Sequence, residues 1–222
     1  MQASFLALEL EKHWTGTKKH IDTTINKSTV EGLDYKYSNL DASVILAVLH
    51  TQDNSLSFGI QDSRIQSTFL ELHKSFKEIY SINQDGSESV GIGRYPEDTY
   101  YAGNPWFLLT HAFAEYLFEL ADHYKKSGSI NVDATNRDFM EKFAKIDNDV
   151  TNIKVDEPEF DKAISNLLAQ AHLYINKSKR HSDPSGQMDE QFDRNNGYMK
   201  SARHLTWSYA SFITMYLSLI HI

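Results

Sequence analysis

The chain contains no cysteine, only four prolines and no long uninterrupted apolar run. Without cysteine, disulfides, thiol nucleophiles and zinc–thiolate sites are excluded. No apolar stretch approaches the roughly 18 residues that a transmembrane helix needs. Basic residues are also scarce, since 22 Lys and Arg stand against 30 Asp and Glu, for a net charge of −8. This acidic balance argues against a basic face that holds nucleic acid.

The remaining composition is that of a folded domain. The 222 residues are 41% hydrophobic and 23% charged, which supplies enough apolar material for one core. The 12 Tyr, 12 Phe and 3 Trp suit either core packing or a stacking surface. The first residues do not predict a signal peptide, because Glu9 and Glu11 interrupt the apolar stretch. Two N-x-S/T sequons make Asn26 and Asn176 glycosylation candidates.

Helical periodicity dominates the chain and predicts an all-α fold. The clearest segment has Asn104 as a capping residue, Pro105 at the first helical position and Gly128 just beyond the end. The last segment is apolar around most of its circumference, which predicts burial on more than one side. The expected helices cover residues 3–14, 40–50, 62–80, 105–127, 136–146, 157–178 and 201–219.

Two connections, 81–104 and 179–200, are long and lack a helical pattern. Long connections of this kind in a compact domain are usually functional or disordered. In the first, Arg94 offers a planar fork of donors, Tyr and Trp rings follow it, and Glu97 and Asp98 stand close by. Flat apolar faces among directional polar groups suit a carbohydrate site. The alternative is a packed loop in which Arg94 pairs with Glu97 or Asp98.

The second connection carries Glu190 among other acidic residues and beside Phe192. A loop carboxylate between helices, next to an aromatic ring, can serve as a general base, although such a group is often merely solvated. The spacing of the acids does not fit a calcium loop, and the ten histidines form no His-Glu-x-x-His motif, so no metal is expected. A nucleophile elbow of the Gly-x-Ser-x-Gly type is also absent.

The two connections together resemble fungal and yeast glucoamylases, the glucan 1,4-alpha-glucosidases of glycoside hydrolase family 15. The similarity runs in family order over nearly the whole chain, and its first motif is long and specific. The residues that carry it are Gly93 to Tyr101, Gly103 to Leu108, Glu190 to Arg194 and Ser201 to Ala210, with weaker matches at 13–16, 48–51 and 75–80.

The resemblance implies an all-α fold that forms part of an (α/α)6 toroid, six inner and six outer helices with the active site in a funnel of loops. It implies that residues 1–222 are the C-terminal portion of a single glucoamylase catalytic domain, without a separate starch-binding domain. It also implies no cofactor.

The family's residue roles transfer to matching positions. Glu190 would be the general base that activates water, and Arg94 would bind sugar hydroxyls. Ser201 would lie close enough to Glu190 to adjust its proton affinity. The residues expected to shape the same subsites, or to pack near the base, are Tyr95, Asp98, Trp106 and Trp207.

The chain departs from the family pattern in three places. Phe192 stands where tyrosine is usual, and His204 replaces a common acidic residue. The general acid of the family lies in an earlier Glu-Glu-x-x-Gly-type segment, which this sequence does not contain. Inverting hydrolysis needs two carboxyl groups, so the chain holds half a site. We therefore expect a fragment of a longer protein or a truncated gene product.

The function implied for the intact protein is inverting, exo-acting hydrolysis of alpha-1,4 bonds, and more slowly alpha-1,6 bonds, at the non-reducing ends of starch or glycogen, releasing beta-D-glucose. A monomer in a secreted or vacuolar location, with no nucleic acid or membrane partner, is expected. The alternative is an inactive fragment or pseudoenzyme that binds glycan or a protein partner through the same loops. A helical bundle with no role in sugar binding is a third possibility.

Overall fold

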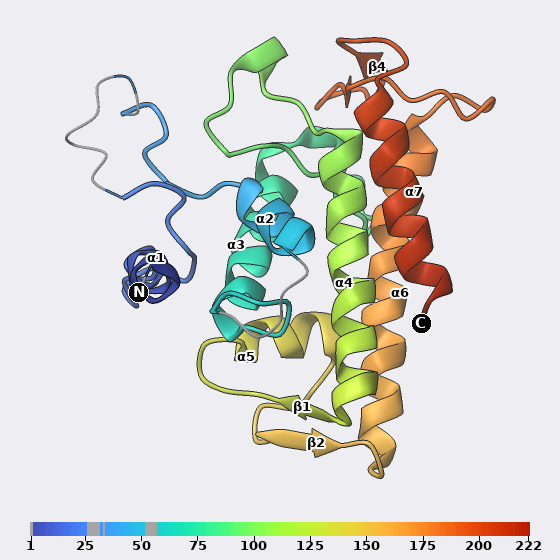
Figure 1. Ribbon diagram of the computed structural model, residues 1–222. Helices are drawn as coiled ribbons and strands as arrows, with labels where there is room; N and C mark the ends of the chain where they lie inside the picture. The colour runs from blue at the N-terminus through green and yellow to red at the C-terminus, as the bar shows by residue number, and fades with distance from the viewer. Residues whose placement is uncertain (1, 26–31, 33, 52–56) are drawn as a thin grey trace.

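The computed structural model describes residues 2–25, 32, 34–51 and 57–222 (Figure 1). Each helix predicted from the sequence is present, with ends shifted by a few residues, which confirms the all-α fold. The helix expected at 136–146 is a short α-helix, α5, that continues as a π-helical turn over Met140–Ala144. The helices are α1 (Gln2–Glu11), α2 (Ser43–Thr51), α3 (Ser63–Ile79), α4 (Phe107–Ser127), α5 (Arg137–Phe139), α6 (Pro158–His181) and α7 (Thr206–Ile220).

Local sequence signals set several helix ends. The Asp62 carboxylate caps α3 by accepting a 2.9 Å hydrogen bond from the backbone N of Arg64. Pro158 occupies the first position of α6, where its missing N–H costs nothing. Gly128 ends α4 with a φ of 70°, as the sequence predicts, because glycine enters the left-handed region without a Cβ penalty.

The predicted start of α4 is wrong by two residues. The helix begins at Phe107, and Asn104 does not cap it. The chain ahead of it is extended, because Trp106 donates its backbone N–H to Ile92 O at 2.8 Å and pairs in a β-bridge with Gln191. These cross-chain bonds hold the backbone out of the helical conformation.

Two short antiparallel strand pairs were not predicted. Strand β1 (Ser129–Asn131) pairs with β2 (Asn152–Lys154), and β3 (Gln191–Phe192) pairs with β4 (Met199–Lys200). Strands of two or three residues are too short to show the alternation by which a strand is recognised in a sequence. The β3–β4 pair matters for function because Glu190 directly precedes it.

The core forms where α3, α4, α6 and the π-helical turn meet. The buried ring of Phe69 lies against Phe113 at a centroid distance of 4.3 Å, Tyr116 at 5.1 Å and Phe143 at 5.2 Å. Figure 1 shows α4, α6 and α7 running side by side, with α2 and α3 on the other flank of α4. This packing leaves the connections to the two helix ends.

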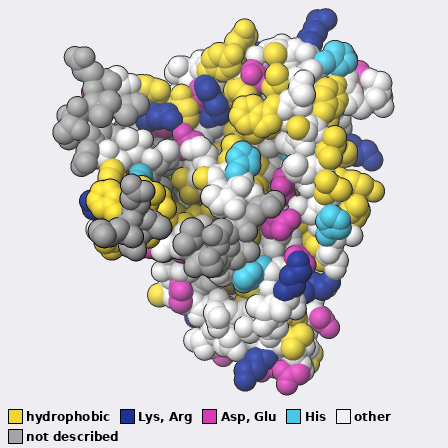
Figure 2. Space-filling model, viewed as in Figure 1, with side chains coloured by type: hydrophobic (Ala, Val, Ile, Leu, Met, Phe, Trp, Pro, Cys, Tyr) yellow, Lys and Arg dark blue, Asp and Glu magenta, His cyan; other side chains and the backbone are white. Residues whose placement is uncertain are grey.

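Helix α7 is covered on one side only, so the expectation of burial on more than one side is wrong for this chain. Its Met215 is buried, whereas most of its large apolar side chains are exposed. Figure 2 shows hydrophobic side chains gathered over α7. No helix of the described residues is long and apolar enough to cross a membrane. The exposed members are Trp207, Phe212, Ile213, Tyr216, Leu217 and Ile220.

Such a face should make the 222-residue chain associate, since large exposed apolar patches favour contact between molecules. We expect the apparent mass to rise with concentration in light scattering after size-exclusion chromatography. Ile213→Glu, at a side chain 57% exposed, should shift the chain toward the monomer. Val155→Glu, at a residue 58% exposed but away from α7, is the matched control and should not. A monomeric wild-type chain at all concentrations would contradict this prediction.

Candidate active site

The connections that carry the sequence motifs lie at one end of the helices. In Figure 1, the loop before α4 and the loops before α7 meet at the upper end, near the N-termini of these two helices. This end holds Arg94 on the first loop and Glu190 on the second.

Arg94 is held by a buried carboxylate. Its Nε and Nη2 donate to the two Asp98 oxygens, each at 2.7 Å, and Asp98 also accepts a bond from the backbone N of Tyr100. The hydrogen bond to Asp98 raises the pKa of the Arg94 guanidinium, so the group stays charged. Of the two partners predicted from the sequence, Asp98 is therefore the one used, and Glu97 is not.

Aromatic rings surround the same guanidinium. Its central carbon lies 5.4 Å from the Tyr95 ring centroid, 4.9 Å from that of Tyr100 and 5.3 Å from that of Trp106. Within the described residues, Nη1 of Arg94 has no hydrogen-bond partner, and the buried Nε1 of Trp106 has none either. The Arg94 side chain is 34% exposed, so its Nη1 is suited to a ligand's oxygen.

The Glu190 carboxylate is fixed through one of its oxygens. Oε2 accepts a short hydrogen bond from Ser201 Oγ and a second, at 2.9 Å, from Gln191 Nε2. Ser201 adopts a φ of 69°, and the backbone N of Glu190 donates to Ala202 O at 2.9 Å. In the described part of the chain no donor reaches Oε1, so this oxygen is available to a water molecule.

The two loops are bonded to one another. Besides the β-bridge between Trp106 and Gln191, the backbone N of Phe107 donates to Glu190 O at 3.4 Å, and Asn104 Nδ2 donates to Gln191 Oε1 at 3.0 Å. Trp106 therefore lies next to both groups, with Arg94 against its ring and the strand of Glu190 on its backbone. These bonds join the two sequence motifs into one cluster.

The remaining predicted residues are Trp207 and the two glycosylation candidates. Trp207 is the second residue of α7 and is half-exposed. Its neighbour Ser208 donates to Asp189 O at 2.7 Å, which holds the start of α7 beside the residue that precedes Glu190. Asn176 is exposed on α6, as glycosylation requires, whereas Asn26 lies outside the described residues.

Sequence reasoning missed the residues that hold the loops together, namely Gln191, Asn104 and Arg194. Arg194 Nη1 donates to Ala102 O at 3.0 Å, and its Nη2 donates to Ile79 O at 2.7 Å. All three residues stand inside the quoted motifs, but polar residues in loops are usually solvated. Nothing in their spacing revealed that they bond across the two connections.

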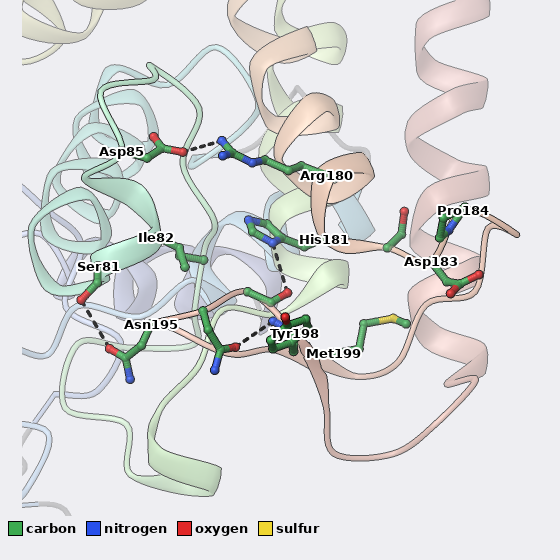
Figure 3. Close-up of a pocket in the computed structure, with 13 residues that line it drawn as sticks. Ser81, Ile82, Asp85, Arg180, His181, Asp183, Pro184, Asn195, Tyr198 and Met199 are labelled. Atoms are coloured by element: carbon green, nitrogen blue, oxygen red, sulfur yellow. Dashed lines mark hydrogen bonds and ion pairs between the residues drawn. The ribbon is translucent and has the colours of Figure 1, made fainter.

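A separate pocket of about 620 Å³ lies behind the β3–β4 hairpin (Figure 3). None of the predicted site residues lines it. One wall is His181, at the end of α6, whose ring stacks on Phe192 at 4.9 Å and whose Nδ1 lies 3.1 Å from Gly197 O. This pocket wall thus supports the strand that follows Glu190. The described residues contain no cluster of side chains that could hold a metal ion.

Loops at one end of this helical domain bring together a carboxylate, an arginine and aromatic rings. This is the architecture of a helical-toroid glycosidase. The family model described as "Glycosyl hydrolases family 15" matches residues 2–217, and the chain therefore belongs to this family.

Named relatives agree with this assignment. The chain is 34% identical over 213 residues to Glucoamylase-1 of Arthroderma benhamiae, covering 93% of this chain and 33% of that protein. The solved family 15 glucoamylase of Hypocrea jecorina superposes with a TM-score of 0.87 at 32% identity, over 98% of this chain and 36% of that one. For the Saccharomycopsis fibuligera glucoamylase the TM-score is 0.85 at 26% identity, with 99% and 49% covered.

These matches confirm the resemblance predicted from the sequence and the assignment to part of an (α/α)6 toroid. The chain spans about a third of the length of the curated relatives that it matches.

Buried histidines make the fold sensitive to acid. Burial lowers the pKa of His73 and His111 to about 3 and that of His181 to about 4. Below the ordinary pKa of roughly 6.5 the unfolded chain binds protons that the folded chain does not. The contribution of these histidines to the free energy of unfolding is therefore fully present above about pH 6.5 and is lost as the pH falls below it. At pH 5.5 each of His73 and His111 should cost about 1.4 kcal/mol relative to pH 7.5.

Urea unfolding at pH 7.5 and 5.5 measures this loss. His111→Gln should reduce the difference between the two pH values, whereas the exposed His50→Gln should leave it unchanged. Equal stability of the wild-type chain at both pH values would show that these histidines take up protons in the folded state.

Proposed function

We propose that residues 1–222 are the C-terminal portion of a single catalytic domain that hydrolyses alpha-1,4, and more slowly alpha-1,6, glucosidic bonds. The substrates would be starch, glycogen and maltooligosaccharides, cut at their non-reducing ends with release of beta-D-glucose. The observation that carries the proposal is the Glu190 carboxylate, held through one oxygen by Ser201 and Gln191, beside Trp106 and its stacked Arg94.

Each group then has a chemical role. Glu190 uses its free Oε1 to take a proton from water as the water attacks the anomeric carbon, while the bonds on Oε2 fix the carboxylate's orientation. Arg94 offers its free Nη1 to sugar hydroxyls, and Asp98 keeps the guanidinium in place. The Trp106 ring lies against the guanidinium and helps to shape the same subsite.

Tyr95, Trp207 and Ser201 complete this half of the site. Tyr95 gives the sugar an apolar wall. Trp207, at the start of α7, packs near the base. Ser201 Oγ donates to Glu190 Oε2 and so holds the carboxylate in one orientation. No cofactor takes part in this reaction, since the catalytic groups are two carboxyl groups and water.

The general acid comes from outside these 222 residues. In inverting enzymes the acid and the base lie roughly 6.5–9.5 Å apart, with the scissile bond and the water between them. The free oxygen of Glu190 needs such a partner on the opposite side of the sugar. We further propose that the intact protein is a monomer in a secreted or vacuolar location, with no nucleic acid or membrane partner.

Replacing Glu190 tests its assignment as the base. In a catalytic domain completed with the N-terminal part of the Saccharomycopsis fibuligera glucoamylase, Glu190→Gln should lower kcat by about 10²–10⁴-fold, because the amide cannot accept the proton. Binding of maltotriose should change little, since the amide keeps the size and hydrogen bonds of the carboxylate. Glu141→Gln, at an exposed residue, is the matched control. Nearly normal turnover in Glu190→Gln would exclude the role as base.

The 222-residue chain alone should release no measurable glucose from maltotriose, because no acid opposes Glu190. A coupled glucose assay over a day, with the completed domain as the positive control, makes the comparison. Sustained glucose release by the purified chain would mean that a residue within it supplies the acid.

A further inference from the structure

The segment 35–42 lies directly against the Arg94 loop, and no sequence pattern connects the two. The backbone N of Ala42 donates to Arg94 O at 2.8 Å. The backbone N of Ser38 donates to Glu97 Oε1 at 2.6 Å. The segment thus follows the backbone of the loop that carries the arginine and forms a wall beside it.

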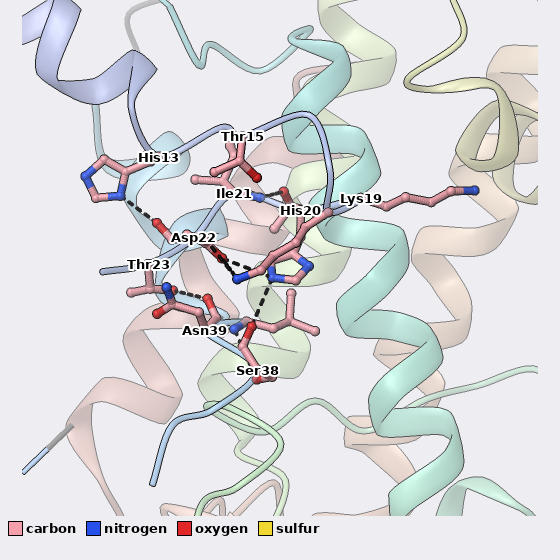
Figure 4. Close-up of polar contacts among 12 residues, drawn as sticks. His13, Thr15, Lys19, His20, Ile21, Asp22, Thr23, Ser38 and Asn39 are labelled. Carbon is pink, nitrogen blue, oxygen red and sulfur yellow. Dashed lines mark hydrogen bonds and ion pairs between the residues drawn. The ribbon is translucent and has the colours of Figure 1, made fainter. Parts of the chain in front are cut away.

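The far side of this wall is anchored as well (Figure 4). Asn39, at a φ of 63°, accepts from the backbone N of Thr23 through its carbonyl at 3.0 Å and donates its Nδ2 to Thr24 O at 2.5 Å. His20 Nε2 lies 3.2 Å from Ser38 O. With bonds on both sides, residues 38 and 39 hold the segment in place against the Arg94 loop.

Two side chains of the segment contact Tyr95. The Tyr35 ring lies 6.2 Å from the Tyr95 ring at an angle of 54°, and the Lys36 Nζ stands 3.8 Å from the Tyr95 ring centroid. Burial, and after it the hydrogen bond with Tyr35, raises the pKa of Tyr95 to about 12. Lys36 also donates to Asp41 Oδ2 at 2.8 Å. The ammonium group is therefore engaged within the wall and positions the Tyr95 ring.

Exposure increases along this line of contacts. Trp106 is 7% exposed, the Arg94 side chain is 34% exposed, and Tyr35 is 52% exposed. Tyr95 lies between the last two, since its ring contacts both. The order describes a path from a buried indole to a rim at the surface. Because Tyr35 is 52% exposed, part of its side chain is accessible to a ligand that extends out of the site.

We propose that Tyr35 is a further sugar-binding residue, an outer platform that stacks on a glucose unit beyond the ones held at Arg94. This inference rests on the proposed function and names a determinant of chain length for the same site. The apolar C–H face of a glucose ring fits a flat aromatic ring. Because the Tyr35 ring already lies against Tyr95, it has less side-chain freedom to lose on binding.

The platform predicts a dependence on chain length. Tyr35→Ala in the 222-residue chain should weaken maltopentaose by about fivefold, the effect of one lost ring contact, and maltose by less than twofold. Saturation-transfer NMR and tryptophan fluorescence, with the sugar in the millimolar range, give both affinities. Tyr35→Phe should bind maltopentaose nearly as well as the wild type. Tyr37→Ala, at a residue 79% exposed, is the matched control and should change neither sugar.

The outcomes separate the two proposals. If the wild-type chain binds maltopentaose and Tyr35→Ala binds it equally well, or loses both sugars equally, the outer platform is excluded and the proposed function stands. If the folded wild-type chain binds neither sugar, the sugar-binding role of Arg94 fails, and the platform fails with it. Tyr35→Leu, which keeps apolar bulk without a flat ring, should show the same selective loss and replaces Tyr35→Ala if that variant does not fold.

Discussion

The candidate site depends on the side-chain amide of Asn104, which joins the loop of Arg94 to the loop of Glu190. Its Nδ2 donates to Tyr101 O at 2.7 Å and to Gln191 Oε1 at 3.0 Å, and its Oδ1 accepts from the backbone N of Arg194 at 3.1 Å. The group is fully buried, so none of these bonds competes with water. Gln191 in turn donates to Glu190. One amide thereby links the backbone of the arginine loop to the orientation of the carboxylate.

This arrangement explains why a site made of loops can be precise. Loops are usually more mobile than the helices they connect, and catalytic geometry tolerates errors of only a fraction of an ångström. Here Arg194 adds bonds to the carbonyls of Ala102 and Ile79, and its guanidinium lies 5.0 Å from the Tyr80 ring centroid. The loops are thus tied to each other and to the end of α3, so they move as one unit with the helices.

Helical periodicity and terminal residues predicted the helices from the sequence, because both signals are local. The residues that carry chemistry were found through motif resemblance, since Glu190 and Arg94 stand 96 positions apart and no local pattern relates them. The prediction that Asn104 caps α4 is wrong for a physical reason. An asparagine ahead of a proline and an apolar run is a normal helix cap, and only the β-bridge between Trp106 and Gln191 shows why the backbone stays extended there.

The position of Tyr35 could not be predicted from the sequence. It lies outside the expected helices and belongs to no motif, so its place beside Tyr95 follows only from the bonds made by Ser38 and Asn39. Tertiary contacts of this kind are set by pairs of residues distant in sequence.

The exposed face of α7 and the unopposed Glu190 point to the same requirement. Trp207 stands at the start of α7, where Ser208 bonds to the residue before Glu190, so one helix carries the apolar face and also supports the loop of Glu190. A segment that covered α7 would bury its large apolar side chains, and each would contribute roughly 1.5–3 kcal/mol to stability. Under the proposed function, the same segment would also exclude water from the side of the sugar opposite Glu190, where an acid would act. The proposal then makes closure of the toroid and completion of the catalytic pair one structural event, in which the packing of α7 positions Glu190.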